Sequence, residues 1–588
     1  MRRLLNKYKL GFAALLVLGM GAGLFYFVAN LNRAESEQEP ESSIPTAIVY
    51  DTTLEDNLGL YKEEDQFKVY EVYLTVYTGL DSKSGESFDL TRLNQIEGTT
   101  FDPELKVNVF VTDPDTGEVV AGEEGESLNA TIELRGQSAR NFDQKSYKIN
   151  LSKQTRLFQG QQKLNLNKHI SDDTRVTQKF AFDAMIGLPH FTSVRTNFMH
   201  VQIKDGTDPA AAYVDYGLFT HVENVDDEYL KVRSLNENAT FLKPVDFAFT
   251  VAEAEQVHSN VDAELILRDI NQPGDDKLLE MITAINEPGT AFDDIFDYYF
   301  DRENYLTWIA LNILLNNYDT MSRNFLLYSP SNVDKWYFLP WDYDASMISP
   351  SEWETSEYAK WFGLQRYWGV SLHRKFFQTP ENVVALSEKI DSLYQAMMQD
   401  GIEEKAQNYR EIYEKYVVAS QADRTYLEEV KREESSAILE RISQMPATLS
   451  YNYATYYERL EAPMPFYLDS ISEGADGIAM NWEDAVDLQN DVLSYEVSIF
   501  TNPDDPAASS IWSQTTTSNQ VLAENVGLAD GIYYWQAVAV DNNGNRQFSF
   551  DRCKLEPGYR KLVRFGMKKF SVQNGVIKEA DDSETPLP

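Results

Sequence analysis

The sequence predicts an α+β protein in which a two-lobed domain is preceded by one membrane-spanning segment and followed by a separate all-β sandwich. Three observations support this prediction. Apolar and polar residues alternate with a period of two in several runs between residues 69 and 225, whereas helical patterns fill most of residues 262–460. Alternating runs with Trp and Tyr return after residue 463. Near the N-terminus, an uncharged apolar run is long enough to cross a bilayer.

The N-terminal segment determines the predicted compartment. Residues 10–31 carry no charged side chain and follow Arg2, Arg3, Lys7 and Lys9. The positive-inside rule therefore makes residues 1–9 cytoplasmic and residues 10–31 a transmembrane signal anchor, and it places the rest at the cell surface or in the periplasm. A cleaved signal peptide is the alternative, but its apolar region is normally shorter and no clear cleavage site precedes Asn30. Residues 32–64 are predicted to be a polar linker.

Composition excludes some classes of partner and leaves room for several domains. The 588 residues include 52 Lys and Arg against 93 Asp and Glu, and the net charge of −41 argues against nucleic acid or an anionic membrane surface as a partner. With 43% hydrophobic and 13% aromatic residues, the chain can bury substantial cores. Its one cysteine, Cys553, cannot form an internal disulfide, so packing must supply the stability.

Basic residues are concentrated between residues 135 and 156 of this acidic chain. The basic island contains Arg135, Arg140, Lys145, Lys148, Lys153 and Arg156 against one acid, Asp143. It predicts an anion site, and a solvated basic strand is the alternative. In the predicted strand KSYKINL, Lys145 shares the apolar face with Tyr147, where a buried ammonium needs an anionic partner. Lys145 is therefore the predicted contact to nucleotide phosphates, with Lys148 as the reserve. Arg140, in the preceding loop, is a further predicted contact to the nucleotide.

A helix and a hairpin are predicted next. The helical pattern of residues 172–186 stops at Gly187, and Asp183 beside its buried stripe is expected to face solvent rather than to pair with Lys145. Residues 198–204 and 213–225 alternate across a turn and predict a β-hairpin. Glu223 marks the end of its second strand, where the backbone of a chain leaving the sheet could pair with an adenine edge.

The stretch Asn316–Asp344 carries the most specific chemical signal. Asp319 precedes Asn324 by five residues, two apolar runs then predict a β-hairpin, and Asp342 and Asp344 follow the second run. Phosphoryl transfer from a nucleotide needs an acid that orients or deprotonates a hydroxyl, together with hard oxygen ligands for Mg²⁺. Protein kinases use the same Asp–Asn spacing and place a metal-binding Asp after the next hairpin.

Residues 461–555 are predicted to form an antiparallel sandwich that resembles a fibronectin type III domain. Trp482 and Tyr495 supply core residues, and Tyr533 stands where a tyrosine corner would, two residues before Trp535. Residues 541–545 are interpreted as a hairpin turn rather than a Ca²⁺ loop, and residues 556–588 as a strand followed by a disordered tail. We expect the sandwich to fold alone and to be dispensable for chemistry, because it carries none of the motifs above.

Four stretches together resemble the spore coat protein H (CotH) kinase family, atypical protein kinases of bacterial and some eukaryotic cell surfaces. They are LRGQSARNFDQKSYKINL, DYGLFTHVENVD, NNYDTMSRN and FLPWDYD, in that order within residues 65–460. The resemblance implies a two-lobed kinase-like domain that uses ATP with Mg²⁺ or Mn²⁺. By this resemblance the catalytic residue is Asp319, the metal ligands are Asn324 and Asp342 with Asp344 sharing that role, and the nucleotide contacts are Lys145 and Glu223. Residues 143–144 depart from the family's usual Pro-Lys, which weakens the phosphate loop but leaves Lys145.

The predicted function is that of a membrane-anchored, extracytoplasmic kinase that transfers phosphate from ATP to Ser or Thr of a protein or cell-surface acceptor. A catalytically inert kinase-fold surface protein, whose sandwich binds a protein or glycan, is the alternative. The joint presence of Asp319, Asn324 and Asp342 favours activity, whereas the scarcity of ATP outside the cytoplasm opposes it. A glycosidase that uses Asp342 and Asp344 as paired carboxylates would leave the basic island unexplained.

Overall fold

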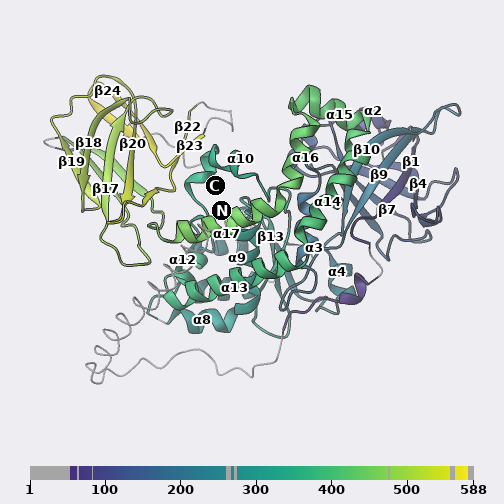
Figure 1. Cartoon of the computed structure of the whole chain (residues 1–588), viewed down its shortest axis with the longest axis horizontal. Coiled ribbons are helices and arrows are strands. Elements are labelled where there is room, and N and C mark those ends of the chain that lie inside the picture. Colours follow the sequence, from purple (N-terminus) through teal and green to yellow (C-terminus); the bar gives the residue numbers. More distant parts are fainter. Residues whose placement is uncertain are drawn as a thin grey trace. The chain divides into compact units, whose positions relative to one another are not determined.

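The computed structural model describes residues 53–579, apart from residues 63–64, 82–83, 260–266, 270–274, 290, 475–476 and 556–562. Figure 1 follows the chain from a strand-rich first lobe in purple, through a helical second lobe in teal and green, to the C-terminal strands in yellow. The predicted signal anchor at residues 10–31 lies outside the described residues. Within the described part, no helix combines the length and apolar character needed to span a membrane.

The first lobe is a closed β-barrel. Its strands are β1 (Val69–Val76), β4 (Leu105–Thr112), β6 (Ala130–Arg135), β7 (Ser146–Leu151), β8 (Lys163–Asn167), β9 (Thr196–Asp205) and β10 (Val214–Val222). They pair in the order β1-β9-β10-β8-β7-β6-β4, and β4 pairs with β1 to close the ring. A further strand, β5 (Val119–Gly122), pairs with β4. β1 and β9 run parallel and the other pairs antiparallel. The sequence predicts most of these strands but not the closure.

Because the barrel is closed, one face of each strand points into the interior and the other points outward. The interior is filled with apolar side chains such as Val72, Val109, Ile149 and Leu166, all with 0% exposure. The opposite face of β6, β7 and β8 points out of the barrel and is polar: Arg135 lies across from Ser146, and Glu133 from Lys148, which in turn lies across from Asn165. Because apolar side chains fill the interior of this barrel, a ligand has to use the outer face.

Helix α3 (Thr177–Met185) is almost wholly buried and contacts β9. Its first turn is fixed by Asp172, whose carboxylate accepts from the backbone N–H and the hydroxyl of Thr177 at 3.0 and 2.7 Å. The expectation that Asp183 faces solvent is wrong. Asp183 is buried, pairs with Lys179 at 2.8 Å and accepts from the Tyr409 hydroxyl at 3.3 Å, because α14 (Ile402–Tyr413) covers this side of the helix.

The second lobe combines helices with a small sheet. Strands β12 (Leu267–Asp269), β11 (Thr240–Pro244), β13 (Phe325–Ser329) and β14 (Tyr337–Pro340) pair in that order, and β13–β14 is the predicted hairpin. The main helices are α7 (Asp275–Asn286), α8 (Phe292–Tyr299), α9 (Arg302–Leu314), α12 (Ser371–Phe377), α13 (Pro380–Gln399), α16 (Ser435–Ser443) and α17 (Met445–Leu460). The buried α9 delivers the chain to Asp319, as predicted.

The C-terminal unit is an antiparallel sandwich of two sheets. One contains β15 (Leu468–Gly474), β16 (Gly477–Trp482) and β19 (Gln520–Glu524). The other contains β18 (Ser510–Thr516), β17 (Ser494–Phe500), β20 (Gly531–Val540), β24 (Lys568–Gln573) and β25 (Val576–Glu579). The Tyr533 hydroxyl donates to the Ala529 oxygen at 3.0 Å, which is the bond of the predicted tyrosine corner. Because β24 pairs with β20, the unit continues past residue 555.

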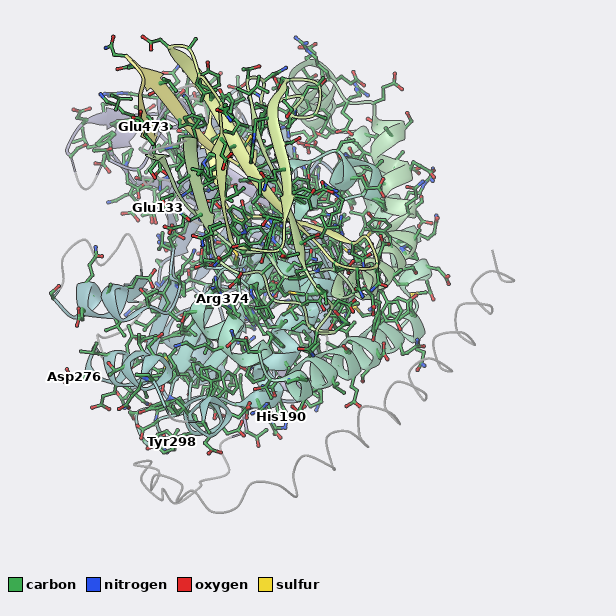
Figure 2. The ribbon with its side chains drawn as sticks, turned by 90° about the vertical axis from the view of Figure 1, so that its left-hand side faces the viewer. Glu133, His190, Asp276, Tyr298, Arg374 and Glu473 are labelled. Atoms are coloured by element: carbon green, nitrogen blue, oxygen red, sulfur yellow. The ribbon has the colours of Figure 1, made fainter. Side chains whose placement is uncertain are left out.

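The sandwich is packed against the second lobe. Strand β23 (Val563–Phe565) pairs with β22 (Arg552–Lys554), and the backbone N–H of Phe565 donates to Glu357 Oε2 at 2.9 Å. The Phe565 ring lies 4.9 Å from the Trp361 ring. Arg374, labelled in Figure 2, belongs to α12, and its guanidinium nitrogen lies 3.5 Å from Oε2 of Glu483 in the sandwich.

Candidate active site

The loop after α9 brings Asp319 and Asn324 side by side. Asn324 has a left-handed backbone with φ of 57°, and its Nδ2 donates to Oδ2 of Asp319 at 2.8 Å. Asn tolerates this conformation better than most residues. Because the amide nitrogen is committed to Asp319, the amide oxygen of Asn324 is the atom that can bind a cation.

Asp342 and Asp344 follow β14 and bring two more carboxylates close to Asp319. Asp342 also has a positive φ, 58°. Its backbone oxygen accepts from Asn317 Nδ2 at 3.3 Å, and its Oδ1 accepts from Gln178 Nε2 of α3 at 3.4 Å. Asp342 is thereby held between the second lobe and α3.

The carboxylates of this site carry more negative charge than their surroundings compensate. Burial, followed by the charge of Asp342, raises the pKa of Asp344 well above its usual range, and Asp172 and Asp319 add to the shift. Burial also raises the pKa of Asp319, against the opposing charges of Arg323 and Arg366. A divalent cation would relieve this repulsion. The oxygens of Asn324, Asp342 and Asp344 are the atoms of this site that could hold such a cation.

Arg135 is the residue of the basic island that faces these carboxylates. Its Nε donates to Asn167 Oδ1 at 2.6 Å, and Asn167 Nδ2 donates to Gln178 Oε1 at 3.2 Å, which leads on to Asp342. Burial lowers the pKa of Arg135 to about 10 while Asp342 acts to raise it, so the guanidinium is charged at neutral pH. The sequence places Arg135 in the island without selecting it. Its place on the polar face of a strand, just before Gly136, was the available signal.

The side chains of Lys145 and Arg140 donate hydrogen bonds to the backbone of the loop that precedes β7. Lys145 Nζ donates to the backbone oxygen of Arg140 at 2.6 Å and lies 3.4 Å from that of Ile96. Arg140 pairs with Asp102 at 3.0 Å and also donates to the backbone oxygens of Leu134 and Gly136. The face that Lys145 shares with Tyr147 points into the filled barrel, opposite to Arg135. This geometry does not support the predicted phosphate contacts of Lys145 and Arg140.

Lys148, the predicted reserve, lies on the outer face together with Arg135. Its Nζ pairs with Glu133 Oε1 at 2.7 Å, and the Lys148 side chain is 31% exposed. Glu133, labelled in Figure 2, belongs to the neighbouring strand β6. Lys148 therefore lies on the outer face of the barrel, where its ammonium pairs with Glu133.

Glu223 follows β10, and its side chain is part of a buried ionic network. Its carboxylate accepts from Arg195 at 2.6 Å and from Arg233 at 2.8 Å, and these arginines keep its pKa low although burial opposes them. The backbone N–H of Glu223 donates to the Arg195 oxygen at 2.9 Å. That N–H is therefore not available to an adenine edge.

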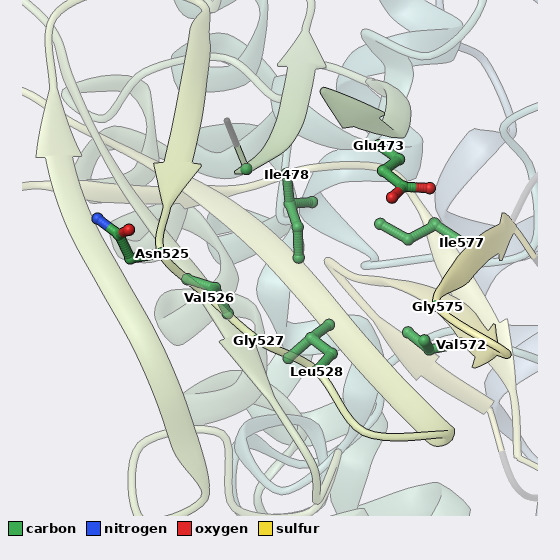
Figure 3. A pocket seen from close by; sticks show the side chains of 10 residues that line it. Glu473, Ile478, Asn525, Val526, Gly527, Leu528, Val572, Gly575 and Ile577 are labelled. Carbon is green, nitrogen blue, oxygen red and sulfur yellow. The ribbon is translucent and has the colours of Figure 1, made fainter. Parts of the chain in front are cut away.

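A hollow of about 430 Å³ lies in the sandwich (Figure 3). It is lined by Glu473, Ile478, Asn525, Leu528, Val572 and Ile577 among others. None of its lining residues belongs to the predicted site. The hollow therefore does not bear on the chemistry of Asp319.

Comparisons with known proteins identify the family of this chain. The family described as CotH kinase protein matches residues 132–456, more than half of the chain, and the match includes Asp319, Asn324 and Asp342. Inner spore coat protein H of Bacillus subtilis (strain 168) is 27% identical over 247 residues, which cover 41% of this chain and 65% of that protein. Among solved structures, the Helicobacter pylori proinflammatory kinase CtkA covers 59% of this chain and 96% of its own, with 8% identity and a TM-score of 0.20, too low to carry weight. On the family match, the chain belongs to the CotH kinase family.

Proposed function

We propose that this protein is a membrane-anchored, extracytoplasmic atypical kinase that transfers a phosphoryl group from ATP to a Ser or Thr hydroxyl of a protein acceptor. The observation that carries the proposal is the convergence of Asp319, Asn324, Asp342 and Asp344, with the pKa of both Asp319 and Asp344 raised by burial and mutual charge. Kinase-type transfer needs this combination of a proton acceptor and hard oxygen ligands.

Each residue of the site has a separate role in the proposal. Asp319, oriented by the Asn324 amide, receives the proton of the acceptor hydroxyl. Its raised pKa makes it a better proton acceptor than an exposed aspartate. The oxygens of Asn324, Asp342 and Asp344 hold Mg²⁺ or Mn²⁺, which neutralises charge on the phosphate oxygens when bound.

The outer barrel face supplies the phosphate contacts. Arg135 offers a planar set of donors suited to phosphate oxygens, and Lys148 offers a point charge beside it. The bonds from Arg135 through Asn167 and Gln178 to Asp342 couple the phosphate side of the site to its metal side. The two lobes thus meet at the proposed nucleotide position.

The inert surface protein is the second candidate, and Gln144 favours it. Gln144 stands where the family usually has a lysine, and its amide is held by Arg175 at 2.8 Å and by Asp423 at 2.9 Å. The Gln144 side chain therefore carries no positive charge for a phosphate, and its amide is already hydrogen-bonded. In this candidate the sandwich, proposed to be of fibronectin type III kind, binds a protein or glycan partner.

Labelled ATP separates the two candidates. The full chain in detergent is incubated with ATP labelled at the γ-phosphate and with Mg²⁺ or Mn²⁺, and label on the chain or on a generic acceptor protein is measured. We expect Asp319→Asn to keep nucleotide binding and to lose roughly 10²–10⁴-fold in turnover, the range of general-base catalysis. Asp342→Ala should lose metal-dependent nucleotide binding as well. Absence of transfer in the wild-type chain, or equal transfer in all three proteins, would overturn the kinase proposal.

A further inference from the structure

Three aspartates of the sandwich converge on one point. Asp487 and Asp491 lie in the loop between β16 and β17, and Asp541 follows β20 and begins the turn before β21 (Arg546–Phe548). One carboxylate oxygen of each lies within 4.8 Å of the others. Residues 541–545 do form the predicted hairpin turn, closed by the bond from Asp541 N to the Asn545 oxygen at 3.1 Å. Folding nevertheless sets this turn against a second acidic loop, which the local sequence does not reveal.

Asp487 buries an oxygen to which no group of the described residues donates. The residue is 9% exposed, and its Oδ1 accepts from the backbone N–H groups of Gln489 and Asp491 at 3.0 and 2.9 Å. Its Oδ2 is fully buried and has no hydrogen-bond partner. A carboxylate oxygen in this state, beside two other carboxylates, would be stabilised by a positive partner.

The protein supplies neutral donors to this cluster. Asn543 Nδ2 donates to Asp491 at 2.6 Å, and Asn545 Nδ2 donates to Asp541 at 2.7 Å. These amides are neutral, so the hydrogen bonds that they donate leave the negative charge of the three carboxylates in place, and that charge attracts a cation.

The cluster lies where the sandwich joins the second lobe. Glu461 directly follows α17, and its backbone oxygen accepts from Asn545 Nδ2 at 3.2 Å. Gln489 Nε2 of the other acidic loop donates to the Leu460 oxygen at 3.1 Å. Both loops that carry the aspartates thus also hold the end of α17, and an ion between them would fasten this joint.

We propose that Asp487, Asp491 and Asp541 form a Ca²⁺ site that fixes the sandwich to the end of α17. An all-oxygen set of three carboxylates selects a hard divalent cation. Because the ligands come from two irregular loops, the site suits Ca²⁺, which accepts about six to eight oxygens in flexible geometry, better than Mg²⁺, which requires a near-ideal octahedron. Water is available to complete the shell. This site is separate from the proposed catalytic metal site and does not depend on the kinase proposal.

The test is Ca²⁺ binding to the full chain after chelator treatment, measured by titration calorimetry. All proteins carry Asp342→Asn, so that the candidate active site does not dominate the signal. We expect one Ca²⁺ site that is weakened at least about tenfold by either Asp487→Asn or Asp541→Asn. Asp530→Asn is the matched control, because it removes the same charge from an exposed position of the same unit, and it should bind as before. Mg²⁺ should bind at least about tenfold more weakly than Ca²⁺.

Thermal unfolding distinguishes a lost ligand from a damaged fold. In chelator, Asp487→Asn and Asp541→Asn should melt at the same or a higher temperature than the parent, because each removes repulsion in the empty cluster. Calcium should raise the melting temperature of the parent and of Asp530→Asn but not of these two variants. Undiminished Ca²⁺ affinity in the double variant Asp487→Asn, Asp541→Asn, equal affinity for Mg²⁺, or no Ca²⁺ binding by the parent would overturn the proposal.

Discussion

His200 of β9 has acidic partners on both ring nitrogens. Nδ1 lies 2.8 Å from Glu71 of β1, and Nε2 lies 3.0 Å from Asp215 of β10. Burial by itself lowers the pKa of His200, but the hydrogen bonds to Asp215 and Glu71 outweigh it and raise the pKa to about 9. The Tyr416 ring, 5.3 Å away, covers the imidazole. The charged ring therefore links three strands of the barrel.

Replacing His200 should make stability depend on pH in a defined direction. A folded pKa raised above the unfolded value of about 6.5 means that the stabilisation is complete below pH 6.5 and is lost as pH rises through about 9. His200→Gln should therefore cost about 1.5–3 kcal/mol at pH 6, the range for hydrogen bonds to a charged group. Near pH 9.5 the difference should shrink, as measured by urea unfolding. An equal difference at both pH values would show that His200 stabilises by packing instead.

Lys145 and Lys148 should respond differently to mutation. Lys148→Ala should weaken nucleotide binding, because it removes a charge from the barrel face that also holds Arg135. Lys145→Ala should instead destabilise the fold by about 1–3 kcal/mol, because the buried oxygens of Arg140 and Ile96 lose their donor. Nucleotide affinity and urea unfolding of both variants check this division. Weaker nucleotide binding in Lys145→Ala with unchanged stability would restore Lys145 to its predicted role.

At the scale of the elements, the sequence predicts local structure well and ring closure not at all. The alternation in residues 69–225 and the hairpin after Asp319 reflect neighbouring residues, so both appear in the structure. Which strand face holds a ligand depends on whether β1 meets β4, a contact that joins distant segments. The apolar face of KSYKINL points to a filled interior for this reason, so the strand pattern favours Lys145 although its face does not reach the candidate active site. Asp183 is misjudged in the same way, because α14 covers it from much later in the chain.

A substitution at Gly217 would test the contact between β10 and α15 (Gln421–Thr425). A Cβ at Gly217 would clash with Asp423 Oδ2, and Asp423 forms a buried ion pair with Lys168 at 2.7 Å. Gly217 also has φ of 80°, which disfavours any side chain. Gly217→Ala should therefore cost about 3–5 kcal/mol, the range for disrupting a buried ion pair.

Gly544→Ala is the matched control, since Gly544 has φ of 88° but nothing within 4 Å of an added Cβ. It should cost only about 1 kcal/mol, the cost of backbone strain. Urea unfolding of both variants gives the comparison. Equal losses would mean that strain alone matters and that α15 yields freely at this contact.

At the scale of the whole molecule, the order of lobes and sandwich follows from the sequence, whereas the way they are joined does not. The motifs lie before residue 460, which is why the sandwich is expected to be dispensable. In the structure, aromatic rings run from the sandwich toward the candidate active site. Phe565 packs on Tyr358 at 5.3 Å, and Tyr358 packs on Tyr318 at 4.9 Å, directly before Asp319. No periodicity in the sequence marks these contacts.

Arg366 joins this group to the candidate active site. Its guanidinium lies 5.4 Å from the Tyr358 ring and 5.5 Å from the Tyr318 ring, and it donates to the Tyr318 backbone oxygen. Its charge also acts on Asp319, where it opposes the rise of the pKa. Phe565 therefore stabilises the segment that holds Tyr358, and that segment in turn positions the loop of Asp319.

A chain that ends at Leu460 should consequently lose both stability and phosphoryl transfer. Removal of the sandwich would expose the ring of Trp361, which has 0% exposure in the whole protein, and would leave Tyr358 without Phe565. Phe565→Ala in the full chain should reproduce part of the loss, about 3–5 kcal/mol for a large aromatic side chain removed from a packed site. Ile532→Ala, at a 55% exposed position of the same sandwich, should leave both properties unchanged. Limited proteolysis of residues 318–366 and labelled-phosphate transfer are the two measurements. Full transfer by the shortened chain, with this segment still protected, would establish that the sandwich is dispensable and that the aromatic contacts do not reach the chemistry.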